Sequence, residues 1–209
     1  MSKPFLMPFA ASLFAVAAFS AGAAAFESYR ITGVRTGDTL TMRAEPAEGG
    51  KPADWQALGS IPANADRVLG TGRSVQVNGQ NWAEVSFGGT LGWVNAKFLT
   101  AMSDPPDLKS ETFQCSGTEP FWGVTLGPEK GEYSDPEQSF ALTIERVQPS
   151  TARLFPLLYR LKDDKGRSYR ATVTQRPGCI DGMSDYEYAF EVLFSGEDNF
   201  EQGCCVIRR

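Results

Sequence analysis

The stretch that decides the fold is "VQVNGQNWAEVSFGGTLGWVNAKFL", residues 75–99. The Asn-Gly pair at 78–79 suits a tight hairpin, because both central positions of such a turn require positive φ. In the following run apolar and polar side chains alternate, with Val85 on one face and Glu84 and Ser86 on the other. The Gly-Gly pair at 88–89 turns the chain again into the run "LGWV". The stretch therefore predicts consecutive antiparallel strands joined by tight turns.

The residues around this stretch, from about Tyr29 to Leu99, resemble a bacterial SH3-like domain. The pieces that carry the resemblance are "DTLTMRAEP" (38–46), "LGSIPANADRV" (58–68), "NWAEVSF" (81–87) and "GWVNAKFL" (92–99). The chain departs from the usual pattern in a longer insert, "AEGGKPADWQALG" at 47–59. The resemblance implies a small, strongly bent β-barrel of a kind that often tethers envelope proteins to peptidoglycan or peptides, usually without catalysis.

The N-terminal residues 1–25 are typical of a secretory signal peptide. One positive charge at Lys3 precedes an apolar run from Phe5 to about Phe19, and small residues precede a cut before Phe26. A retained N-terminal anchor is the alternative, although the apolar run is short for a membrane span. We therefore expect a periplasmic or secreted protein with no transmembrane anchor after cleavage.

A polar segment with two prolines, residues 101–110, separates an expected first domain (26–100) from a second (111–209). Residues 138–147 and 187–192 alternate between apolar and polar side chains, and no amphipathic helical stretch exceeds ten residues. The second domain is therefore expected to be an antiparallel β-barrel or compact sandwich built from hairpins. Together the two halves predict an all-β protein, with an SH3-like small barrel followed by a disulfide-stapled β-domain.

Three motifs of the second half resemble those of an uncharacterised family of bacterial envelope proteins, many of them predicted to be membrane-associated or lipoprotein-like. They are "GTEPFWG" at 117–123, "CIDGMSD" at 179–185 and "GCC" at 203–205. The chain differs from the family at Ala189, where a proline is common, and it lacks a lipidation cysteine.

Four cysteines in an exported chain indicate disulfides first. Side chains of neighbouring strand residues point to opposite faces, so Cys204 and Cys205 require different partners. A bond between these neighbours or a zinc site with this spacing is disfavoured. The hairpin before them favours Cys179 with Cys204 and leaves Cys115 with Cys205, while the swapped pairing stays open.

The charge distribution and the absence of histidine argue against nucleic-acid binding and against histidine-based catalysis or metal binding. Residues 26–100 contain seven Lys/Arg and seven Asp/Glu, whereas residues 101–209 contain twelve and eighteen, a balance of minus six. No basic patch favours nucleic acid, and the acidic half favours cationic or neutral partners. The chain has no histidine, which removes the commonest general base near neutral pH and a common metal ligand. No metal and no cofactor are expected.

The candidate ligand-binding residues are aromatic side chains and carboxylates. Each also has a structural interpretation: the aromatic residues fill the core of a small domain, and the acids satisfy nearby loop amides. A calcium site at "CIDGMSD" lacks regularly spaced oxygen ligands, and Ser184 lacks the partners of a serine nucleophile. The candidates are Trp82, Phe87, Trp93, Glu119, Trp122, Asp181 and Asp185.

These observations predict a non-enzymatic, exported cell-envelope binding protein whose SH3-like module engages peptidoglycan or a peptide segment. The alternative is an inhibitor or interaction partner of a cationic envelope protein, such as a lysozyme, through the acidic C-terminal domain. A weaker alternative is a wall-glycan hydrolase that uses paired carboxylates.

Overall fold

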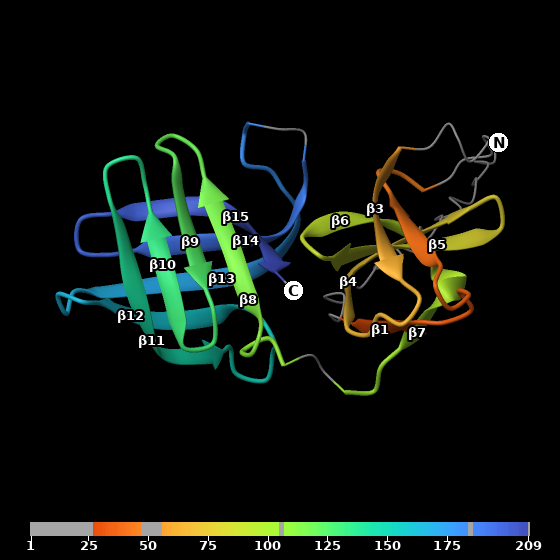
Figure 1. Ribbon diagram of the computed structural model, residues 1–209, viewed down its shortest axis with the longest axis horizontal. Coiled ribbons are helices and arrows are strands. Elements are labelled where there is room, and N and C mark those ends of the chain that lie inside the picture. The colour runs from red at the N-terminus through yellow and green to blue at the C-terminus, as the bar shows by residue number, and fades with distance from the viewer. Residues whose placement is uncertain (1–26, 47–55, 105–106, 184–185, 209) are drawn as a thin grey trace, which may run out of the picture.

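The computed structural model describes residues 27–46, 56–104, 107–183 and 186–208. The described chain is nearly all β, with a single 3-10 turn, η2 (Ala96–Phe98), and antiparallel strand pairs throughout (Figure 1). The expected signal peptide and most of the insert lie outside these residues. Within them, no helix is long and apolar enough to cross a membrane.

The first domain is a seven-stranded sheet with the order β3-β2-β6-β5-β4-β1-β7. Its strands are β1 (Ser28–Ile31), β2 (Thr39–Arg43), β3 (Ala57–Pro62), β4 (Val68–Val77), β5 (Gln80–Phe87), β6 (Thr90–Asn95) and β7 (Leu99–Ala101). Apolar side chains from six of the strands meet in one cluster, namely Ile31, Leu40, Met42, Ile61, Val68, Val85 and Val94. The cluster holds the sheet in a curved form around its own core.

The predicted hairpin at 78–79 is confirmed. Asn78 and Gly79 have φ of 51° and 74°, and Val77 pairs with Gln80 across the turn. The next turn joins Phe87 to Thr90, also as predicted. In "GWV", Gly92 has a steric role, because a Cβ there would lie 3.0 Å from the carbonyl oxygen of Arg43. A glycine therefore lets β2 approach β6 closely enough to pair with it.

The second domain is a closed eight-stranded barrel with the order β10-β11-β12-β13-β14-β15-β8-β9. The sequence left open a barrel or a sandwich, and the structure shows the barrel. Its strands are β8 (Thr112–Gly117), β9 (Trp122–Leu126), β10 (Lys130–Ser134), β11 (Ser139–Pro149), β12 (Leu157–Asp163), β13 (Ser168–Cys179), β14 (Tyr188–Ser195) and β15 (Phe200–Arg208). Alternate side chains of these strands fill the interior, led by Phe113, Tyr159, Phe190 and Phe194, all fully buried.

Both favoured disulfides are present. Cys115–Cys205 joins β8 to β15, the first and last strands of the barrel, which are also hydrogen-bonded neighbours. Cys179–Cys204 joins the end of β13 to β15 across β14, with Cα atoms 5.8 Å apart. They close loops of 90 and 25 residues, so the chain-entropy model assigns them about 4.5 and about 3.5 kcal/mol of stability.

The two domains are packed against each other. Leu69 and Leu91 of the first domain belong to the hydrophobic cluster of the barrel, and so does Leu108 from the expected linker. Glu84 and Ser86, on the face of β5 opposite Val85, are only 3% and 5% exposed. This face is buried because β14 and β15 of the barrel lie against β5 and β6 (Figure 1).

Candidate binding cleft between the domains

A cleft of about 650 Å³ lies where the first domain meets the residues that lead into β14. One wall carries Arg73, Glu84 and Trp93 from three adjacent strands, β4, β5 and β6. The opposite wall is formed by Tyr186 and Glu187 of the second domain. The remaining lining residues all come from the first domain: Ala44, Glu45, Pro46, Gln56, Leu58, Leu91 and Gly92.

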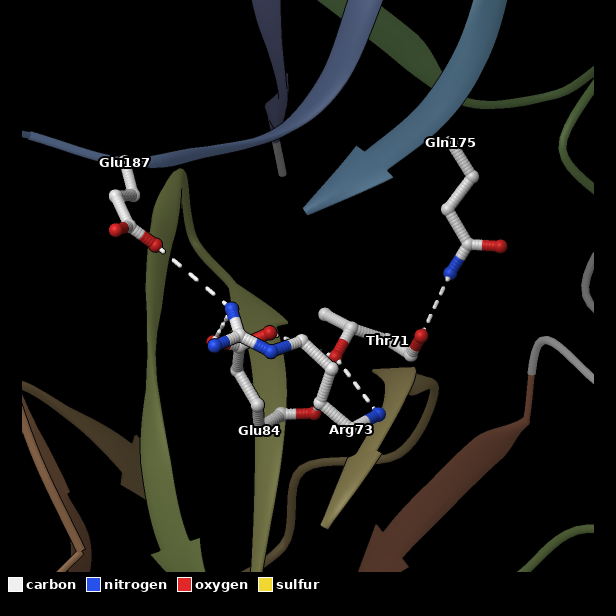
Figure 2. A network of polar contacts seen from close by, with 5 residues as sticks. All are labelled: Thr71, Arg73, Glu84, Gln175 and Glu187. Carbon is white, nitrogen blue, oxygen red and sulfur yellow. Dashed lines mark hydrogen bonds and ion pairs between the residues drawn. The ribbon is translucent and has the colours of Figure 1, made fainter. Parts of the chain in front are cut away.

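A buried carboxylate organises the polar side of this cleft (Figure 2). Glu84 is 3% exposed and accepts hydrogen bonds from the Thr71 hydroxyl and from Nη1 of Arg73, both at 2.8 Å. Both carboxylate oxygens are thereby satisfied. Burial raises the pKa of Glu84, while the Thr71 bond and the Arg73 charge oppose the rise. The carboxylate therefore acts as a fixed anchor for Arg73.

Arg73 is the residue that links this anchor to the rest of the cleft. Its guanidinium carbon lies 5.6 Å from the centroid of the Trp93 ring, within cation–π range. Its Nη1 is also 3.8 Å from the Glu187 carboxylate of the second domain, which is 53% exposed (Figure 2). The side chain of Arg73 itself is 51% exposed. The cleft therefore presents a cation, a loosely held carboxylate and an aromatic ring side by side.

Two further hydrogen bonds join the domains, one of them made by the opposite wall. The Tyr186 hydroxyl donates to the carbonyl oxygen of Gly89, in the turn between β5 and β6. Gln175 Nε2 donates to the carbonyl oxygen of Thr71 at 3.3 Å (Figure 2). Both bonds join side chains of the second domain to backbone atoms of the first. Hydrogen bonds between the domains therefore hold the two walls of the cleft relative to each other.

The predicted aromatic candidates of the first domain occupy three different environments. Trp93 is half-buried and lines the cleft. Trp82 is 6% exposed and lines a separate cavity of about 480 Å³ with Arg35, Asp38 and Phe98. Phe87 is half-buried and packs against the core of the first domain. Of the three, Trp93 combines an accessible ring with neighbouring charges.

The candidates in the second domain do not converge on the interdomain cleft. Glu119 is exposed and has a φ of 72°. Trp122 is 6% exposed and belongs to the barrel core, where its ring stacks on that of Tyr133 with centroids 6.3 Å apart. The Asp181 carboxylate accepts hydrogen bonds from the Tyr188 hydroxyl at 2.9 Å and the Met183 amide at 3.0 Å. Asp185 lies outside the described residues.

Sequence reasoning missed Arg73, Glu84 and Glu187. Glu84 stands at a polar position of an alternating strand, a pattern typical of exposure, and only the covering barrel buries it. Arg73 follows Gly72, whose φ is 82°, in a stretch of β4 where the register with β5 shifts. Glycine inside a strand pattern, here Gly70 and Gly72, is the local signal that could have indicated such a bulge.

No family model, no curated protein and no solved structure matches this chain.

Proposed function

We propose that this chain is an exported, non-enzymatic binding protein of the cell envelope, in which the SH3-like module engages peptidoglycan or a peptide segment. The supporting observation is the cleft itself, where Trp93 lies beside Arg73, and Arg73 in turn lies 3.8 Å from the partly exposed Glu187. A flat aromatic face next to charges of both signs suits a peptide segment, which carries apolar, cationic and anionic groups in turn.

The arrangement favours binding over chemistry. The buried acid in the cleft, Glu84, is hydrogen-bonded through both oxygens and holds Arg73 in place. Trp93 supplies contact area without a reactive group. The hydrolase alternative has the least support, because Glu119 is exposed and the Asp181 carboxylate is occupied by Tyr188 and Met183.

The test is a pull-down of the mature chain on purified sacculi and on stem-peptide beads. The whole chain is used, because the first domain buries Leu69 and Leu91 against the barrel. Trp93→Ala is expected to lose most retention. The control is Phe200→Ala, which removes an aromatic side chain that is 74% exposed on the barrel. Equal retention of the two variants, or no retention of the unchanged protein on either support, would refute the proposal.

A second function, binding of a cationic envelope protein through the acidic domain, is favoured by one specific observation. The turns after β12 and β14, which lie on the side of the barrel away from the first domain (Figure 1), contribute to a cavity lined by four carboxylates and one arginine. Complementary charge would speed association with a basic partner and make it sensitive to salt.

A further inference from the structure

The outer wall of the barrel carries three arginines in line on the neighbouring strands β11, β12 and β13 (Figure 1). Arg146 of β11 lies directly opposite Arg160 of β12, and Arg160 lies directly opposite Arg170 of β13. All three residues are exposed. Neighbouring strands are about 5 Å apart, so the line spans about 10 Å at the backbone. We call these three residues the arginine row; no single stretch of the sequence contains it, because each strand contributes one member.

A β-bulge places Arg146 in this row. Ile144 pairs with Leu161 and packs against the core of the barrel, and Val147 packs against the same core. Simple alternation from Ile144 would point Arg146 toward that core as well. The register shift between Ile144 and Arg146 inserts Glu145 as an extra residue, so that Glu145 and Arg146 are both exposed. Bulges re-aim side chains in this way and occur often beside functional sites.

The arginine row is not neutralised by the protein. Within the described part of the chain, none of its three guanidinium groups has an ion pair or a side-chain hydrogen bond. Glu145, the acid next to Arg146, instead lies 2.8 Å from Nζ of Lys162. Like charges directly opposite each other destabilise a sheet, so the row destabilises the free protein and a bound anion would remove the repulsion. The positions on either side of the row on these strands carry no acid: Thr143, Gln148, Leu158, Lys162, Ser168 and Thr172.

We propose that the arginine row binds a linear polymer of phosphate groups, laid across β11, β12 and β13. A guanidinium group is always charged and forms paired hydrogen bonds with the oxygens of a phosphate. Three such groups in line suit a ligand that repeats its negative charge along a chain. The wall of an eight-stranded barrel is convex, and a flexible chain can follow its curve.

Other anionic partners fit this surface less well. A protein–protein interface has an apolar centre, whereas the positions beside the row offer one large apolar side chain, Leu158, which is half-buried. Single-stranded nucleic acid stacks its bases on aromatic rings, and none of these positions carries one. An anionic membrane is flat, and it would repel a chain whose residues 101–209 have a balance of minus six. The phosphate polymer requires only the charges that the row provides.

The inference is independent of the interdomain cleft and of the ligand proposed for it. It is tested with the full mature chain by calorimetric titration with inorganic polyphosphate at several salt concentrations. We expect saturable binding that weakens as salt increases, because each phosphate contact releases counterions. The comparison probes are polyglutamate of the same total charge, oligothymidylate, and vesicles of equal parts phosphatidylglycerol and phosphatidylcholine. Each is expected to bind more weakly than polyphosphate.

The deciding variant is Arg160→Gln, in the middle of the row. We expect it to weaken polyphosphate binding at least about fivefold at low salt and to reduce the slope of log affinity against log salt concentration by about 1, the loss of one phosphate contact. Its free energy of unfolding in urea should be unchanged or higher, because the exposed side chain is removed from between two like charges. A loss of affinity without a loss of stability separates binding from a structural role.

The matched control is Arg208→Gln, which removes the same charge from an exposed position of β15, three strands from β12 in the barrel order. It is expected to change affinity less than about twofold. Equal loss of affinity in the two variants would show that net charge alone attracts the polymer and would overturn the proposal. Binding of any comparison probe as tightly as polyphosphate, or no saturable heat with polyphosphate, would overturn it as well.

Discussion

Replacement of Arg73 by methionine should destabilise the protein by an amount that grows with pH. The change roughly keeps the length of the side chain but removes the Arg73 donor, so that the Thr71 hydroxyl is left to bond the Glu84 carboxylate, which is 3% exposed. Breaking a fully buried ion pair costs about 3–5 kcal/mol, whereas an exposed pair contributes about 0–1 kcal/mol. Because Arg73 is half-exposed, this pair lies between the two cases. We expect a loss of about 2 kcal/mol at pH 8.

The pH dependence follows from the raised pKa of Glu84. An acid whose pKa is higher in the folded than in the unfolded state makes the folded protein bind a proton more tightly. Its contribution to stability therefore declines as pH rises from the ordinary carboxyl range through the folded pKa. Removing Arg73 raises the pKa of Glu84 further, so the variant loses more stability than the unchanged protein as pH rises. Near pH 5 the loss should fall to about 1 kcal/mol, the contribution of an uncharged hydrogen bond.

Urea unfolding followed by tryptophan fluorescence measures both losses, since Trp93 lies under the Arg73 guanidinium. The control is Arg160→Met, the same substitution at an exposed position of β12. In the double variant with Glu84→Gln, the further loss caused by Arg73→Met should shrink below about 1 kcal/mol, because the amide carries no charge to neutralise. A loss that is equal at the two pH values, or no larger than that of the control, would show that the buried pair does not organise this interface.

Two further predictions address the packing of the domains and the loop before β14. Leu91→Ala should lower the free energy of unfolding in urea by about 2–4 kcal/mol, because the Leu91 side chain belongs to the hydrophobic cluster of the barrel. The control Leu58→Ala, at a position that is 36% exposed, should lower it by less than about 1 kcal/mol. Similar losses in the two variants would contradict the packing of Leu91 against the barrel. Burial and the hydrogen bond to Asp181 raise the pKa of Tyr188 to about 12. In Asp181→Asn, ultraviolet titration should show this phenol ionising at lower pH, and an unchanged profile would exclude the bond.

The fold was largely predictable because its signals are local. The Asn78-Gly79 turn, the alternation on either side of it and the pairing of Cys179 with Cys204 each depend on residues close in sequence. Closure of the second domain into a barrel, with β8 beside β15, depends on strands that are far apart in the chain. The sequence therefore predicted hairpins while leaving barrel and sandwich open.

The candidate site was less predictable, because it depends on contacts between the domains. Trp93 was identified from its residue type, but its place in a cleft with Tyr186 and Glu187 depends on how the two domains pack. Glu84 occupies a position that alternation assigns to the polar face of β5, and that face is buried by a domain folded from distant sequence. Neither composition nor periodicity carries that information.

The position of the cysteines connects the fold to the cleft. Cys179 ends β13, and its bond to Cys204 fixes that strand end to the wall of the barrel. The chain then returns to β14 through Tyr186 and Glu187, the two residues that form the second wall of the cleft. Tyr186 is fixed in turn by its bond to the Gly89 carbonyl of the first domain. Cys179 is thus held by a covalent bond, and Tyr186 is held by an interdomain hydrogen bond. The disulfide therefore stabilises the barrel at the strand end from which the chain runs on to the second wall of the cleft.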